Sequence, residues 1–211
     1  MAKQARAFAT RELIVQAAGV VFARQNYAKA TLGDVIAEAS VTQVALYFHF
    51  ESKKAVALEV ISRQHELFME VGQTLMQRDL RGVAAMVTLS RELAQRITTN
   101  PLVQAGLRLS TESADTFVDT ASGPYEDWIA AAEVFIRRAI DDGDIAPHHD
   151  SSLLAAYVIA TFTGVQSLSQ ARTGWADILE RLEEMWVFLL GGVATSPERA
   201  SAWNIHSLLN D

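Results

Sequence analysis

Residues 31–54 read TLGDVIAEASVTQVALYFHFESKK, and this stretch decides the fold of the N-terminal part of the chain. Thr31 can cap the helix that follows it. Asp34, three residues later, suits the positive end of the helix dipole. After a break, Thr42 can cap a second short helix that ends near residue 49, and Ser52 can cap the helix that follows it. Two short helices joined by about three residues have the proportions of a helix-turn-helix.

The side chains of this stretch divide into a core and a contact surface. The expected small core consists of Val35, Ile36, Ala39, Val41, Leu46 and Phe50. The other side chains lie around a helix of about two turns, and such a helix fits the roughly 12 Å wide major groove of DNA. Tyr47 and His49 can donate to phosphates, and Gln43 can pair with an adenine edge. Val44 or Ala45 can touch a thymine methyl group. Core packing is the structural alternative for the aromatic residues, and we expect it for Phe50.

The rest of the chain is predicted to be helical. Only 4 prolines and 11 glycines interrupt 211 residues, and alternation typical of strands is rare. Pairs such as Asn100-Pro101 and Gly123-Pro124 mark most of the boundaries. The predicted helices cover residues 10–25, 53–77, 81–99, 102–112, 124–142, 151–172, 175–193 and 197–209.

Composition narrows the class of protein. Half of the residues are hydrophobic and only 20% are charged, so we expect a ligand cavity or a subunit interface to bury additional apolar surface. The absence of cysteine excludes disulfides and thiolate sites. No apolar signal core follows the basic N-terminus, and the longest apolar stretch, residues 153–162, is far shorter than the ~20 residues of a membrane span. These features predict a soluble cytoplasmic protein.

The charge distribution favours DNA contact by one part of the chain. The net charge is −7. However, residues 1–60 hold seven basic and five acidic residues, and the remainder holds eleven basic and twenty acidic residues. Only the N-terminal quarter therefore suits a phosphate backbone.

The segments IVQAAGVVFARQNYAKATLGDVIAEA and VTQVALYFHFESKKAVALEVI resemble the TetR family of repressors. A short helix ending in Tyr-Phe-His-Phe, followed by Ser-Lys, is that family's most specific signature. The resemblance implies an all-α fold, with a helix-turn-helix domain at residues 1–52 and a ligand-binding and dimerisation domain at residues 53–211. The dimer would bind palindromic operator DNA.

The resemblance also implies a set of DNA contacts. It places Lys53 near the DNA backbone, with a solvated lysine as the alternative. The family commonly has Lys-Gly where this chain has Gln43-Val44, and it prefers glycine at Ser40; these departures bear on the operator sequence. The expected DNA-binding residues are Lys3, Arg6, Thr31, Thr42, Gln43, Val44, Ala45, Tyr47, Phe48, His49 and Lys53.

Further segments, among them NPLVQAGLRLS, PYEDWIAAA and ATFTGVQSLSQ, resemble the γ-butyrolactone-type autoregulator receptors of actinomycetes. The resemblance implies a repressor released by a small lactone- or butenolide-like signal. It places Trp128 against the ligand ring, with Gln64 and Thr161 as polar contacts in a mostly apolar pocket. The expected ligand-binding residues are Gln64, Leu89, Trp128, Val158, Thr161 and Phe162. Structural roles are the alternatives: Trp128 in the core, Gln64 in solvent and Thr161 bonded to a helix carbonyl.

The last two long helices contain more apolar residues than one protomer's core needs. We interpret them as a four-helix dimer interface, which would set two reading helices about one DNA turn apart. The expected interface residues are Leu154, Val165, Leu168, Leu182, Trp186 and Leu189.

Other functions have weaker support. A sensor of an antibiotic or another hydrophobic molecule is the first alternative, and a helical enzyme is a remote one. No Glu-x-x-His pair, nucleophile elbow or glycine-rich phosphate loop occurs. His148-His149-Asp150 is expected to be a polar loop rather than a metal site. We therefore expect no catalytic residues, no cofactor and no metal.

Overall fold

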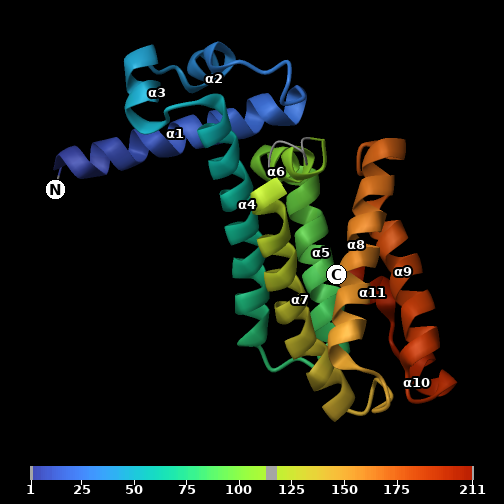
Figure 1. Cartoon of the computed structure of the whole chain (residues 1–211). Coiled ribbons are helices and arrows are strands. Elements are labelled where there is room, and N and C mark those ends of the chain that lie inside the picture. Colours follow the sequence, from blue (N-terminus) through green and yellow to red (C-terminus); the bar gives the residue numbers. More distant parts are fainter. Residues whose placement is uncertain (1, 113–117, 211) are drawn as a thin grey trace. The chain divides into compact units, whose positions relative to one another are not determined.

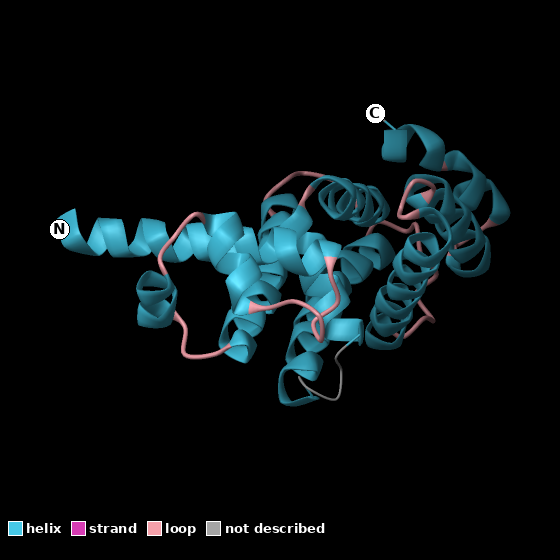
Figure 2. Ribbon diagram, turned by 90° about the horizontal axis from the view of Figure 1, so that it is seen from above, coloured by secondary structure: helices cyan, strands magenta, loops and turns pink. Residues whose placement is uncertain are grey.

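The computed structural model describes residues 2–112 and 118–210. Helices joined by short loops make up most of this part of the chain, and Figure 2 shows no strand there. One antiparallel bridge joins Ile145 to Ala194. The predicted all-α class is confirmed.

The helices have the following bounds: α1 Ala2–Arg24, α2 Leu32–Ala39, α3 Gln43–His49, α4 Lys53–Met76, α5 Gly82–Thr99, α6 Pro101–Glu112, α7 Val118–Asp141, α8 Ser151–Thr173, α9 Ile178–Val193, α10 Pro197–Ala202 and α11 Ile205–Asn210. Figure 1 labels them along the chain.

The chain divides into two compact units. The first unit contains residues 1–67 and 99–122, so α6 joins the N-terminal helices although it lies far along the sequence. The second unit contains residues 68–98 and 123–211. The predicted division at residue 52 stays a prediction about the helix-turn-helix module.

The first unit is built around α1. Helices α2 and α6 both pack on α1, and Figure 1 shows α2 and α3 lying along it. Gly19 makes the contact with α6 possible, because a Cβ atom there would lie 2.8 Å from Leu102 Cα. The predicted small core is present: Val35, Leu46 and Phe50 are buried in it. Ile36, Ala39 and Val41 are partly buried against this core.

The three predicted caps of this unit are confirmed. Thr31 and Asp34 form a capping box at the start of α2. The Thr42 hydroxyl accepts a 3.1 Å hydrogen bond from the Ala45 amide, and the Ser52 hydroxyl accepts one of 3.1 Å from the Ala55 amide. Ser40, where the family prefers glycine, ends α2 in the left-handed conformation with φ 52°. The turn that presents α3 is therefore fixed by local hydrogen bonds.

The second unit is a helical body with its own core. Its largest fully buried side chains include Trp186, Phe135 and Leu182. Helices α8 and α9 pack on each other, and α10 and α11 pack on α9. Close packing at Gly82, where a Cβ atom would lie 2.2 Å from the Ala139 amide nitrogen, joins α5 to α7.

Three predicted boundaries are wrong. Helix α1 begins at Ala2 rather than near residue 10, because no breaker separates the basic N-terminus from the amphipathic segment. Pro124 lies inside α7 instead of starting it. The predicted helix 197–209 is broken at Trp203 and Asn204, between α10 and α11.

Helix α8 is long and apolar. Among the described residues, this 23-residue helix is long and apolar enough to cross a membrane by length and composition alone. Only 22% of its most apolar window is buried. One such helix is weak evidence for a membrane span, because a core helix of a soluble protein passes the same test.

Candidate DNA interface and ligand pocket

Helix α3 presents its predicted contact residues to solvent. Val44 and Phe48 are 80% and 76% exposed, and Tyr47 is 50% exposed. Thr42 and Gln43 are exposed as well, whereas Ala45 and His49 are half-buried. The core-packing alternative therefore fails for Tyr47 and Phe48. It holds for Phe50, which is 4% exposed beneath the guanidinium of Arg11.

Lys53 makes contacts within the protein that the sequence analysis did not predict. Its ammonium donates hydrogen bonds of 2.8 Å to the Tyr27 carbonyl and 3.0 Å to the Ala30 carbonyl. It also lies 4.4 Å from the centre of the Tyr27 ring. Lys53 thus ties the start of α4 to the loop between α1 and α2, and its contact with DNA stays a prediction.

The remaining predicted DNA contacts lie outside α3. Arg6 is exposed on the N-terminal turns of α1, and Thr31 is exposed at the cap of α2. The Thr31 hydroxyl is already used in the capping box. Lys3 lies in α1, and its side chain is outside the described part of the structure.

The predicted ligand residues separate into several places. Leu89, Val158 and Phe162 line a small apolar cavity of about 40 Å³ among α5, α7, α8 and α9. Its other lining residues, which the sequence analysis did not single out, are Met86, Ser90, Leu93, Ala132, Ile159, Met185 and Trp186. Their heptad-like spacing is also that of ordinary core residues, so the sequence offered no separate signal for a cavity.

The polar groups of this cavity are satisfied internally. Trp186 Nε1 donates a 2.9 Å hydrogen bond to Ser90 Oγ, and that hydroxyl donates to the Val87 carbonyl at 2.8 Å. Because both polar groups already have partners within the protein, the cavity presents an apolar surface.

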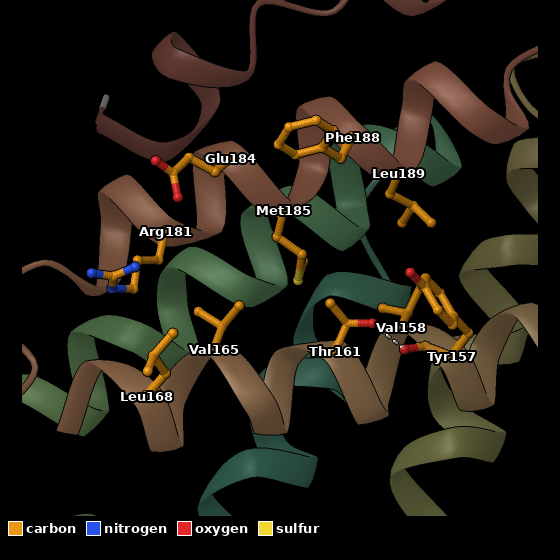
Figure 3. A pocket seen from close by; sticks show the side chains of 10 residues that line it. All are labelled: Tyr157, Val158, Thr161, Val165, Leu168, Arg181, Glu184, Met185, Phe188 and Leu189. Carbon is orange, nitrogen blue, oxygen red and sulfur yellow. Dashed lines mark hydrogen bonds between the residues drawn. The ribbon is translucent and has the colours of Figure 1, made fainter. Parts of the chain in front are cut away.

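Thr161 is separated from this cavity. It lines a different groove, between α8 and α9, and its hydroxyl donates a 2.7 Å hydrogen bond to the Tyr157 carbonyl (Figure 3). This is the helix-carbonyl alternative considered for Thr161. Thr161 and Phe162 face different pockets because neighbouring residues on a helix point in directions about 100° apart, and the contact of Thr161 with ligand stays a prediction.

Trp128 and Gln64 each have defined surroundings. Trp128 is half-buried on α7, with its ring centre 5.8 Å from that of Phe68 and 5.0 Å from that of Tyr125. Gln64 is 1% exposed on α4, which rules out the solvent-facing alternative. Its Nε2 has no hydrogen-bond partner in the described structure. An unsatisfied buried amide is costly, so Gln64 is suited to meet a polar atom of another molecule.

The groove between α8 and α9 is an apolar feature of the body's surface. It has a volume of about 330 Å³, and Arg181 and Glu184 flank it (Figure 3). Exposed apolar side chains lie along the same two helices: Leu153, Tyr157, Leu168, Val187 and Phe188.

The predicted interface residues divide between this groove and the core. Val165, Leu168 and Leu189 line the groove. Leu154, Leu182 and Trp186 are at most 8% exposed within the protomer itself, and their assignment to the dimer interface stays a prediction. Helical periodicity locates an apolar stripe but does not separate the side that faces a partner from the side that faces the core.

Hydrogen bonds to a single carboxylate, that of Asp177, fix the turn between these helices. Asp177 accepts hydrogen bonds from Ser169 (2.6 Å), Thr173 (2.7 Å) and Arg181 (2.7 Å). These donors hold the pKa of Asp177 well below its usual range, with Ser169 contributing most. No group of three or more His, Asp or Glu residues that could hold a metal ion occurs within the described ranges.

Comparison with known proteins identifies the family to which this architecture belongs. Residues 14–60 match the family model described as bacterial regulatory proteins, tetR family, and residues 80–195 match a tetracyclin repressor-like C-terminal domain. The chain belongs to the TetR family. The A-factor receptor protein of Streptomyces griseus is 34% identical over 92% of this chain and 67% of its own length.

Several solved TetR-family structures share the fold. A γ-butyrolactone receptor described as ArpA-like is 27% identical, covers 97% of this chain and 98% of its own, and has a TM-score of 0.79. CprB of Streptomyces coelicolor, solved with its biological operator sequence, is 26% identical over 98% of this chain and 99% of its own, with a TM-score of 0.78. Both similarities span the helix-turn-helix and the body together.

Proposed function

We propose that this TetR-family regulator is a homodimeric repressor that binds palindromic operator DNA and is released by a small γ-butyrolactone- or butenolide-like molecule. The observation that carries the proposal is similarity to a γ-butyrolactone receptor over 97% of the chain, including the body where TetR-family regulators differ most. The receptor match at 34% identity covers 92% of the chain and 67% of the receptor's own length. As a regulator of this kind, the protein acts by binding rather than by catalysis, in the cytoplasm.

The body offers chemistry that suits such a ligand. Trp128 supplies a flat ring, and the cavity lined by Leu89, Val158 and Phe162 is apolar with no unsatisfied polar group. A lactone ring could lie against the indole, and its alkyl tail could enter the cavity. Gln64 belongs to the first unit, and its role as a donor to the ligand stays a separate prediction.

Coupling between ligand and operator would run through α4. This one helix carries both Phe68, which contacts Trp128, and Lys53, which binds the loop before α2. A ligand that binds the released state about 100-fold more tightly would supply about 2.7 kcal/mol toward release.

The dimer would use the α8–α9 groove. Phe188 is 82% exposed and Leu153 is 72% exposed, and several large apolar side chains exposed on two packed helices indicate a contact surface for a partner. A second copy of the chain would cover it, which would also explain why so little of α8 is buried in one protomer.

A mobility shift with the DNA upstream of the protein's own gene tests the proposal. We expect a shifted complex that a synthetic γ-butyrolactone dissolves, and a Trp128→Ala variant that binds DNA normally but no longer responds. The matched control is Trp203→Ala, on the loop between α10 and α11. If an antibiotic dissociates the complex and no lactone does, the ligand belongs to the antibiotic class instead. Parallel loss of DNA binding and response in Trp128→Ala would assign Trp128 a folding role.

A further inference from the structure

Two large apolar side chains stand exposed on α3. Val44 and Phe48 lie four residues apart, so they occupy one face of the helix. Their exposed fractions, 80% and 76%, are among the highest of the large apolar residues described. Both follow a helix start that the Thr42 hydroxyl caps, so the pair is presented on an ordered element. An apolar pair held in water at a contact surface indicates an apolar partner group.

Helix α3 also lacks long basic side chains. Between Gln43 and His49 the chain carries no lysine and no arginine. Arginine and lysine make the commonest specific contact to guanine, through its O6 and N7 atoms. Gln43, which is exposed directly before Val44, is instead suited to the N6 and N7 atoms of adenine.

We infer that α3 reads A·T pairs through thymine methyl groups, which Val44 and Phe48 contact in the major groove. The inference rests on the proposed DNA-binding function and adds its chemistry of recognition. The 5-methyl group of thymine is the apolar feature that base edges display in the major groove, and a branched or aromatic side chain covers it well. Gln43 then reads the adenine of such a pair.

The polar residues of α3 have a different role. The Tyr47 hydroxyl and the His49 ring flank the apolar pair and can donate to phosphates, which fixes the helix in the groove without reading sequence. The ring of His49 packs edge-on against that of Phe48, with 5.0 Å between centres. This contact restricts the Phe48 ring beside a phosphate-binding residue.

The test begins with selection of a binding duplex from a random pool by the full-length protein. Each thymine of the selected half-site is then replaced by deoxyuridine, which removes only the methyl group. Dissociation constants are measured by fluorescence anisotropy for the wild type, Val44→Ala and Phe48→Ala. Leu13→Ala is the matched control, because Leu13 is an apolar residue 57% exposed on α1 and outside α3.

We expect the selected half-site to contain thymines whose conversion to deoxyuridine weakens wild-type binding about four-fold each, as for burial of one methylene-sized group. Val44→Ala should reduce this penalty at one position and Phe48→Ala at another. Leu13→Ala should leave every penalty unchanged. The penalty isolates methyl contact from any general loss of affinity, because the same variant is compared on two duplexes.

Other outcomes overturn the inference. Deoxyuridine without effect at every position would exclude methyl recognition, and penalties that persist in both alanine variants would assign the methyl contacts to other residues. A change of oligomeric state in Val44→Ala and Phe48→Ala would make this face a protein interface. If no duplex is enriched at all, the proposed DNA-binding function fails, which is distinguishable from failure of methyl recognition alone.

Discussion

Gly106 on α6 lies directly against Gln64 on α4: a Cβ atom at residue 106 would come within 2.4 Å of the Gln64 Cβ and 2.8 Å of its Cγ. Only a glycine permits this approach without displacing the buried glutamine. The side chain predicted to bind ligand is therefore positioned by a neighbouring helix that also packs on α1.

Substituting Gly106 by alanine should strain this contact. We expect the free energy of unfolding to fall by about 1–3 kcal/mol, as for overpacking of a core. Urea unfolding at one fixed protein concentration measures the change, because dimer stability depends on concentration. Gly72→Ala on α4 is the matched control: nothing lies within 4 Å of its Cβ position, so it should be neutral or stabilising. Unchanged stability of Gly106→Ala would mean that Gln64 yields without cost.

Lys53→Met should separate the observed role of this lysine from the predicted one. The variant loses both hydrogen bonds to the carbonyls of Tyr27 and Ala30, so we expect a lower thermal unfolding midpoint. The slope of log affinity against log salt for operator binding should stay unchanged. A slope smaller in magnitude by about 1.8, which is about 0.9 for each of the two protomers, would instead identify a phosphate contact. Lys54→Met, at the exposed neighbouring position, is the control for charge.

Arg81 protects a buried carboxylate. It donates two hydrogen bonds, of 3.0 Å and 2.7 Å, to Asp144, whose side chain is 0% exposed. Arg81→Met should lower the free energy of unfolding, because it leaves the buried charge without its main partner. Arg78→Met, at an exposed arginine nearby in sequence, should change stability by less than about 0.5 kcal/mol. Chemical denaturation decides between the two, and equal effects would show that Asp144 does not depend on Arg81.

Asp177 should make the body sensitive to acid. Hydrogen bonds from Ser169, Arg181 and Thr173 lower its pKa in the folded state, so its stabilisation is complete above the unfolded pKa, near 3.9, and is lost as the pH falls below that value. The stability difference between wild type and Asp177→Asn should be constant from pH 7 to pH 5 and should shrink below about pH 4. Unfolding midpoints measured across this range test the sign. Asp79→Asn is the exposed control, and a difference that grows on acidification would contradict the assignment.

The local elements of this chain follow from short-range chemistry. Thr31, Thr42 and Ser52 each accept the capping bond that the sequence predicts, because a cap depends only on residues two or three positions away. The pattern of residues 31–54 likewise placed Val35, Leu46 and Phe50 inside and left Val44, Tyr47 and Phe48 outside. In a helix of two turns, few other arrangements could bury the apolar residues.

The assignments that depend on distant segments required the tertiary structure. Leu182 and Trp186 occur in the same apolar helix as Leu189, and periodicity alone did not reveal that the first two face the protomer's own core. Thr161 and Phe162, adjacent in sequence, line different pockets because the helices packed on either side of α8 differ. Lys53 has the residue type of a phosphate contact, yet the loop before α2 brings two carbonyls within reach of its ammonium.

The sequence by itself determined the helix-turn-helix, its caps and the all-helical class, since hydrogen bonding and apolar periodicity act over a few residues. The tertiary structure decided which apolar faces are buried, which are free for a partner, and which polar groups are already satisfied. Those properties depend on what a helix packs against, and that is set by residues tens of positions away in the chain.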